Sequence, residues 1–438
     1  MPYFTKEEET LSREIQVHER PPLVQTLPLS LQHLFAMFGS TVLVPIIFKV
    51  DPATILLMNG IGTLLYLYIC KWQIPAYLGS SFAFIAPVLL ILGDNPTANY
   101  PKVLGAFIVV GAIFTLFALL IKAVGTKWID VVLPPAAMGP IVALIGLELV
   151  PVAAEMAGWI RPDNLDPAVN WSPDPSHVTV SILTLAIIVL GNVLFRGFMK
   201  IIPILIGFIA GYVIAWFFGL VKFEQVEEAS FFSLPTFTFP QFDLTAILAI
   251  LPAALVVLAE HIGHLIVTEN IVKKPFSKEP GLHRSLLGNG LSTMLSGFVG
   301  STPNTTYGEN IGVMTITRVY STYVLSIAAV IAIILSFFGK LSAVISSVPD
   351  AVLGGVSIML FGVIAVAGIR MLVEGQVDYG KPKNLILTSV VLVIGISGTK
   401  LTIGTTELKG MVLATIVTIL LSLFFKIIEV LKLSNDQE

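Results

Sequence analysis

The sequence predicts an all-α polytopic membrane protein, and three observations lead to this fold class. Of its 438 residues, 55% are apolar and only 12% are charged, which is about half the charged share of an average soluble domain. The mean hydropathy is +0.90. Apolar stretches long enough to cross a bilayer also recur along the whole chain. Together these features exclude a soluble enzyme, a disulfide-stabilised secreted domain, a disordered chain and a nucleic-acid-binding protein.

Fourteen stretches are candidate membrane spans, because each is an apolar segment of about the length that a spanning helix needs. They extend over 28–48, 53–70, 76–93, 103–123, 128–150, 178–195, 201–221, 244–267, 284–300, 304–318, 320–339, 343–369, 385–399 and 409–428. The preceding tail, 1–27, is polar and has no apolar region of the signal-peptide type. We therefore expect the first span to be the insertion signal, and 429–438 to form a C-terminal tail.

The distribution of lysine and arginine predicts that both termini are cytoplasmic. If fourteen spans start from a cytoplasmic N-terminus, 18 of the 25 basic residues fall in the two tails and the even-numbered loops, and 7 fall on the other side. Cytoplasmic loops are enriched in basic residues, so this split favours an even number of spans. The net charge of −3 shows no bias toward polyanions such as nucleic acids.

Two spans are too polar to lie against lipid as uniform helices. They contain residues 77–84 and 301–310, and they are the third and the tenth spans. Because they are seven spans apart, they occupy the same position in two seven-span halves that enter the membrane from opposite sides. Paired broken helices of this kind form the substrate site of secondary transporters. The alternative is that their small residues only allow close helix packing.

The eighth span carries ionisable side chains after a long apolar run. Glu260 and His264 are four residues apart and share one face of a helix. Ionisable residues inside a membrane are costly and indicate function, although an ion pair that only holds helices together is the alternative. His261 points away from that face and is interpreted as a packing or interfacial histidine. The order of these residues does not match the zinc motif His-Glu-x-x-His, so no metal is expected.

The tenth span predicts an extended segment followed by a helix that begins near Gly308 or Glu309. The first N–H groups of that helix would be unpaired donors, and Glu309 would supply an acceptor beside them. In the third span, the backbone at Ser80, Ser81 and Phe82 would face them. A planar lactam with alternating N–H and C=O groups fits this layout better than a metal ion or a sugar. Two buried carboxylates are hard to keep ionised together, which suggests coupling to protons.

These residues resemble a known family of carriers. The run Glu309-Asn-x-Gly312-x-x-x-x-Thr317-Arg318 resembles the signature of the nucleobase–ascorbate transporter family, also called nucleobase–cation symporters. The Gln32-His33 pair resembles a second hallmark of the family. The segments 75–84, 259–264 and 301–310 are most similar to those of its bacterial uracil-transporting members. The resemblance extends over about residues 18–430.

The resemblance implies two inverted seven-span repeats, with short antiparallel strands in spans three and ten. A core domain would comprise 28–123 and 244–339, and a gate domain would comprise 128–221 and 343–428. It also implies a homodimer in the cytoplasmic membrane that imports uracil together with protons and needs no cofactor. Carried over by position, uracil would be held by the side chains of Glu260 and Glu309 and the backbone of Phe82 and Gly308. The coupling proton would involve Glu309 and His264.

Three further residues have supporting roles by the same resemblance, namely Ser81, Tyr307 and Asn310, with Tyr307 at the boundary between core and gate. Phe361 stands where a tyrosine partner is expected at that boundary, and it is not counted as a site residue. A xanthine or purine symporter of the same family is the nearest alternative, although Glu309 favours uracil. A passive channel is the alternative from another class. A membrane enzyme is not supported, because the sequence has no nucleophile elbow, phosphate loop or metal cluster.

Overall fold

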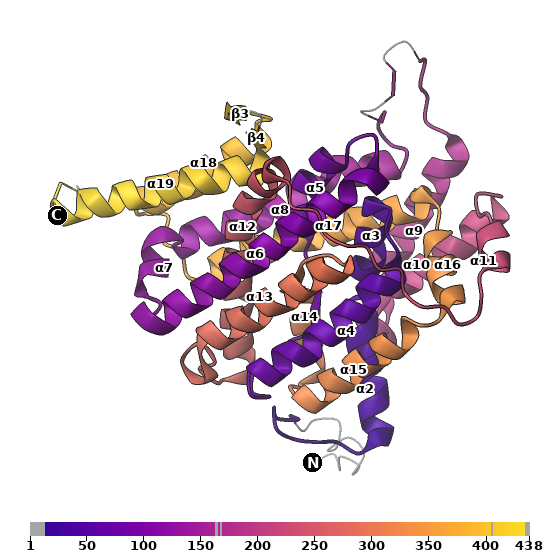
Figure 1. Cartoon of the computed structure of the whole chain (residues 1–438), viewed down its shortest axis with the longest axis horizontal. Coiled ribbons are helices and arrows are strands. Elements are labelled where there is room, and N and C mark those ends of the chain that lie inside the picture. Colours follow the sequence, from indigo (N-terminus) through magenta and orange to yellow (C-terminus); the bar gives the residue numbers. More distant parts are fainter. Residues whose placement is uncertain (1–13, 163–164, 167–168, 404–405, 434–438) are drawn as a thin grey trace.

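The computed structural model describes residues 14–433 except 163–164, 167–168 and 404–405. Helices dominate this part of the chain (Figure 1). Eight helical segments in it are long and apolar enough to cross a membrane: α2–α3 (Leu23–Ala36 and Phe38–Phe48), α4 (Pro52–Ile69), α6 (Pro96–Val124), α8 (Pro135–Met156), α9 (Pro175–Leu194), α12 (Leu244–Val272), α17 (Asp350–Glu374) and α19 (Gly410–Val430). The prediction of a helical membrane protein is confirmed.

The remaining elements are shorter or less apolar. Four apolar ones are η1–α5 (Phe82–Phe84 and Ile85–Leu92), α10 (Pro203–Phe217), α15 (Thr322–Leu335) and α18 (Pro382–Ile396). The other helices are α7 (Lys127–Val132), η2 (Gly197–Ile201), α11 (Glu224–Glu228), η3 (Ser277–Gly281), α13 (Leu282–Val299), α14 (Gly308–Thr317) and α16 (Gly339–Ser346). The strands are β1 (Leu78–Ser80), β2 (Asn304–Thr306), β3 (Lys400–Ile403) and β4 (Thr406–Lys409).

Proline and aspartate set the starts of several helices. Proline fixes φ at a helical value and lacks the N–H that would be unpaired in a first turn. In α4, Asp51 Oδ1 accepts a hydrogen bond from the Ala53 amide at 2.9 Å, and Pro52 follows this cap. In α12, Asp243 Oδ1 caps the Ala246 amide at 2.8 Å. These local signals explain why the helices begin where apolar stretches follow a polar residue.

Two predicted span boundaries are wrong in the same way. The sequence places single spans at 128–150 and 343–369, but the structure separates α7 from α8 and α16 from α17. Each break lies just before a proline, Pro134 or Pro349, where the backbone is extended. The residue before a proline avoids helical geometry, so an uninterrupted apolar run does not continue as one helix.

A two-stranded antiparallel sheet joins the third and tenth predicted spans. Leu78 pairs with Thr306, and Ser80 pairs with Asn304. All six strand residues are buried. A Cβ on Gly79 would collide with the side chains of Met37 and Tyr307, so only glycine fits at the centre of β1. Helical backbone resumes just beyond each strand, at Phe82 and at Gly308.

Two pairs of long helices touch through glycine. Between α6 and α13, a Cβ on Gly111 would lie 2.6 Å from the Gly290 carbonyl oxygen, and one on Gly290 would lie 2.8 Å from the Gly111 oxygen. Between α8 and α17, the equivalent distances are 2.8 Å from Gly139 to the Gly368 oxygen and 2.5 Å in the reverse direction. Backbones therefore meet directly along both contacts, as small residues allow in membrane helices.

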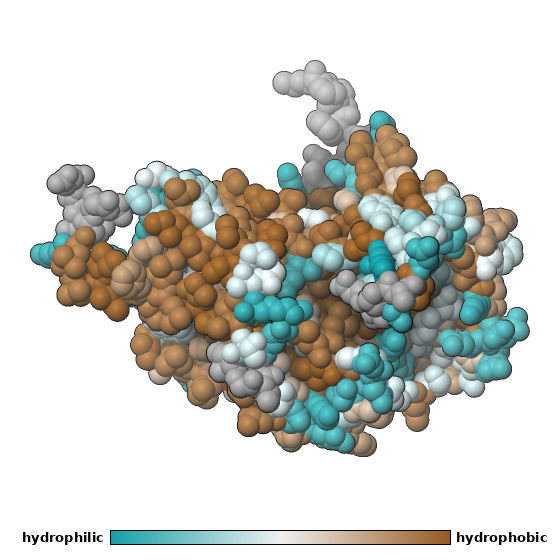
Figure 2. Space-filling model, turned by 90° about the horizontal axis from the view of Figure 1, so that it is seen from above, coloured by the Kyte–Doolittle hydropathy of each residue, from teal (hydrophilic) through white to brown (hydrophobic). Residues whose placement is uncertain are grey.

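Apolar side chains cover most of the face shown in Figure 2. Large exposed residues include Val189 and Val193 on α9 and Phe424 and Ile427 on α19. Soluble monomers do not expose apolar surface on this scale. The exterior of the fold therefore fits contact with lipid.

Candidate functional site

A cavity of about 280 Å³ lies where α12, α17 and the β2–α14 segment meet. Its walls carry Phe82, Val142, Glu260, His264, Val267, Thr305, Thr306, Tyr307, Gly308, Glu309, Ile311, Gly312, Val363, Ile364, Val366, Ala367, Arg370 and Met371. The two carboxylates and the histidine singled out in the sequence therefore line one cavity, together with Phe82 and Gly308.

Glu260 and His264 project into this cavity from consecutive turns of α12. The Glu260 Oε2 atom is buried and has no hydrogen-bond partner among the described residues. His264 directs Nδ1 to the Thr306 hydroxyl, at 3.3 Å, rather than to Glu260. An unpaired buried carboxylate oxygen is destabilising, so Glu260 is ready to accept a donor from a ligand.

Glu309 stands in the first turn of α14. The prediction that a helix begins near Gly308 is confirmed, because α14 starts at that residue. Amide groups of a first turn carry partial positive charge and favour an acceptor. A Cβ on Gly308 would lie 3.2 Å from His264 Nε2, which shows how closely the start of α14 approaches the histidine.

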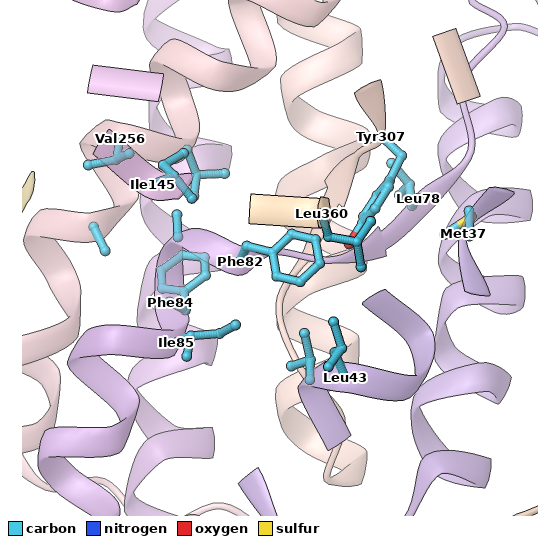
Figure 3. Packing of buried hydrophobic residues seen from close by; sticks show 14 of the residues in the cluster. Met37, Leu43, Leu78, Phe82, Phe84, Ile85, Ile145, Val256, Tyr307 and Leu360 are labelled. Atoms are coloured by element: carbon cyan, nitrogen blue, oxygen red, sulfur yellow. The ribbon is translucent and has the colours of Figure 1, made fainter. Parts of the chain in front are cut away.

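Aromatic rings close the cavity at the end where η1 begins. The Phe82 ring lies 5.8 Å from Phe361, edge to face, and 6.2 Å from Tyr307. In Figure 3, Phe82, Tyr307 and Leu360 lie side by side, with Leu43 next to them. The Tyr307 hydroxyl donates to the Ser80 carbonyl oxygen at 2.6 Å and so fixes the ring against β1.

Two supporting residues have contacts that the sequence did not predict. Asn310 Oδ1 lies 2.7 Å from His33 Nδ1, and both side chains are buried. This contact fastens the first turn of α14 to α2. Ser81 pairs its backbone N–H with the Pro303 oxygen at 3.0 Å, while its buried hydroxyl has no partner among the described residues. Ser81 thus holds the end of β1 without lining the cavity.

Sequence reasoning missed three polar residues of the cavity wall, Thr305, Thr306 and Arg370. Thr305 and Thr306 belong to the polar run that precedes Gly308, and the Thr305 hydroxyl is buried and unpaired among the described residues. Arg370 lines the cavity from α17, and its Nε pairs with Glu374 Oε1 at 2.6 Å. The sequence contains a signal for the two threonines, which belong to a polar run. It contains none for Arg370, because α17 comes from a part of the chain without a polar motif.

Broken helices that meet at an internal cavity with ionisable residues define the class of secondary transporters. Solved transporter structures share the fold. The transmembrane domain of the cyanobacterial bicarbonate transporter BicA aligns with a TM-score of 0.60 at 14% identity, covering 93% of this chain and 98% of that one. The inward-facing murine anion transporter Slc26a9 aligns with a TM-score of 0.68 at 11% identity, covering 98% and 73%.

The chain belongs to the Permease family, whose model matches residues 24–404. A uracil permease of Paenibacillus larvae is 62% identical over 424 residues, 97% of this chain and 99% of the relative. The uracil permease of Escherichia coli K12 is 61% identical over 420 residues, 96% of each chain. That of Bacillus subtilis is 46% identical over 415 residues, 93% of this chain and 94% of the relative. The resemblance drawn from the sequence is confirmed, and these relatives are permeases rather than enzymes.

Proposed function

We propose that this protein imports uracil together with protons across the cytoplasmic membrane. One observation carries the proposal: two carboxylates and a helix N-terminus meet in a cavity between two broken spans. Full-length relatives named uracil permease support the substrate. The homodimer stays a prediction.

Uracil offers ring N–H donors and carbonyl acceptors along its edge, and the cavity offers their complements. The unpaired Glu260 oxygen accepts from ring N–H groups. The Gly308 and Phe82 backbones bind the ring edge, and the Phe82 ring stacks on its face. Glu309 is the second carboxylate that faces the ligand, and it takes up the coupling proton. A bound ligand excludes water from the cavity, and two adjacent negative charges are then costly.

Packing of the helices supports fourteen spans in two inverted repeats. The eight long segments, the four shorter apolar ones, α13 and the β2–α14 segment make up the fourteen. When the spans are numbered in order, a contact between two spans recurs between the two spans that lie seven positions away from them. The contact of α4 with α15 corresponds to that of α13 with α6, and the contact of α9 with α17 corresponds to that of α18 with α8. A short helix and a proline precede both α8 and α17, which occupy equivalent positions.

The accessibility of the cavity supports a cytoplasm-facing state. Its lining includes exposed residues near the C-terminal end of α17, such as Val366 and Arg370. The basic-residue distribution assigns that end to the cytoplasm. In contrast, the buried Phe82 ring packs against the buried Phe361 ring, and the buried Leu360 lies beside Phe82 (Figure 3). The cavity is then a site from which substrate leaves inward.

Labelling with a membrane-impermeant thiol reagent tests the topology. In a Cys70→Ser background, single cysteines at Arg161 and Lys222 should react from outside the cell. Cysteines at Lys273 and Lys383 should react only from the cytoplasmic side, because an odd-numbered repeat places these loops on opposite faces. Labelling of Lys222→Cys from the cytoplasm alone would contradict the inverted repeat.

Uptake of labelled uracil into proteoliposomes tests the function. A proton gradient, acid outside, should drive accumulation above the external concentration, and a protonophore should abolish it. Excess unlabelled uracil should compete fully, whereas xanthine and uric acid should compete weakly. Efficient competition by xanthine would assign a purine carrier instead. Equilibration without accumulation would assign a passive channel.

A further inference from the structure

A chain of buried polar side chains leads away from the cavity behind β2. His264 Nδ1 lies 3.3 Å from the Thr306 hydroxyl, which lies 3.5 Å from His261 Nδ1. His261 Nε2 lies 2.9 Å from the Ser285 hydroxyl, and that hydroxyl lies 2.7 Å from the Tyr66 hydroxyl. Three helices, α4, α12 and α13, and the strand β2 therefore contribute to one continuous series of hydrogen bonds.

The series is enclosed by protein beyond its first two members, His264 and Thr306, which line the large cavity. His261, Ser285 and Tyr66 are completely buried. A small cavity of about 10 Å³ lies beside these five residues, which is about the space that a single water molecule occupies. His264 lines both this small cavity and the large one. Thr306 also lines both cavities, so the two residues together form the junction between the substrate site and the buried series.

The partners of Ser285 argue against a purely structural role. Buried hydroxyls in membrane helices usually bond to the carbonyl one turn earlier, as Thr268 does with His264 and Ser357 with Leu353. Ser285 instead meets two side chains from other helices, His261 and Tyr66. Each of these groups can both donate and accept a hydrogen bond, which is what transfer of a proton requires.

We propose that His264, Thr306, His261, Ser285 and Tyr66 form a proton-release route that starts in the wall of the substrate cavity and leads away from it through the protein. It rests on the proton coupling proposed above. Its far end lies near the cytoplasmic end of α4. Tyr66 is five residues before the exposed Lys71, and Arg284 donates to the Ile69 carbonyl oxygen at 3.1 Å between them. A proton arriving at Tyr66 therefore has about one and a half helical turns left to the aqueous face.

The hydroxyl of Thr306 limits the directions of donation. It faces two histidine Nδ1 atoms but holds a single hydrogen, so at least one histidine must donate to it, and transfer of a proton through it requires the other to accept from it. When His264 Nδ1–H donates, Nε2 of the neutral ring is free to accept a proton beside Gly308. His261 then accepts at Nδ1 and donates from Nε2 to Ser285.

Transfer moves each proton by one place and leaves every group with the number of protons that it held at the start. A proton enters at His264 Nε2, and the Nδ1 proton passes to Thr306. Thr306 gives its own proton to His261 Nδ1, His261 gives the Nε2 proton to Ser285, and Ser285 gives its proton to Tyr66. Tyr66 releases one proton toward the cytoplasm, so one enters and one leaves. Rotation of the hydroxyls and exchange of the histidine tautomers restore the starting arrangement.

Comparison of net uptake with exchange tests the route in proteoliposomes. Exchange of internal for external uracil needs no net proton release, whereas proton-driven uptake needs it in every cycle. Tyr66→Phe and Ser285→Ala should therefore slow proton-driven uptake about tenfold or more and leave exchange near the wild-type rate. Ser357→Ala, which removes an equally buried hydroxyl outside the series, should change neither rate.

Thr306 supplies a second, independent pair of variants. Thr306→Ser keeps the hydroxyl and should retain proton-driven uptake, whereas the nearly isosteric Thr306→Val should lose it. Normal proton-driven uptake in Tyr66→Phe and Ser285→Ala would overturn the route, and so would an equal loss of exchange and net uptake in both. If a protonophore does not reduce uptake by the wild-type protein, the proton coupling itself is overturned. Failure of the route and failure of the proton coupling therefore give different results.

Discussion

Replacement of Glu260 by alanine should weaken uracil binding about tenfold or more while the protein still inserts into the membrane. The mutation removes the acceptor and leaves the ring N–H groups of uracil facing an apolar wall. Each buried donor left unpaired costs about 1–3 kcal/mol, and about 1.4 kcal/mol corresponds to a factor of ten in affinity. Isothermal titration calorimetry of the detergent-solubilised protein measures this change directly.

Two further variants make the result specific. Glu260→Gln keeps one acceptor oxygen at the same position and should bind uracil with intermediate affinity. Glu407→Ala removes a carboxylate that pairs with Lys400 at the protein surface, at 3.1 Å, and should bind like the wild type. Wild-type affinity in Glu260→Ala would remove this residue from the substrate site.

Glu309→Gln should keep measurable uracil binding but abolish accumulation driven by a proton gradient. Glutamine has the shape and hydrogen-bonding groups of the neutral acid but cannot release a proton. The start of α14 favours an ionised Glu309 when the cavity holds water, and bound uracil reverses this preference by excluding water beside Glu260. By the proposed mechanism the side chain changes its charge in each transport cycle, and glutamine should suppress that change.

Parallel measurements of binding and of uptake against a gradient check this prediction. His264→Leu is the informative companion, because it should slow net uptake more than it weakens binding if the histidine passes the proton onward. Normal concentration of uracil by Glu309→Gln would show that another group carries the coupled proton.

Much of the site could be predicted because its signals are local. An ionisable pair at helical spacing in an apolar run singled out Glu260 and His264, and both line the cavity. A polar lead-in followed by glycine and glutamate predicted the start of α14 at Gly308. Both inferences need only the physics of desolvation and of helix ends, which act over a few residues.

Contacts between distant parts of the chain could not be predicted. The sequence indicates only a packing or interfacial role for His261. Its hydrogen-bond partner Ser285 lies on another helix, and local spacing does not identify such a partner. His33 and Asn310 are 277 residues apart and meet only in the fold. The β3–β4 hairpin also escaped notice, because its alternating pattern of polar and apolar residues extends over only the four residues of β3. Hydrophobic periodicity reports which face is buried and not what is buried against it.

The glycine contacts described above decide where the molecule can deform. Where backbones touch, as at Gly111–Gly290 and Gly139–Gly368, no side chain can change rotamer to permit sliding, so each helix pair is stiff. Contact between Phe82 and α17 is made through rings and branched side chains, which can exchange partners as helices shift. Transport therefore concentrates its movement in a thin layer of side chains. A compound wedged into that layer should arrest the carrier by preventing this exchange of partners.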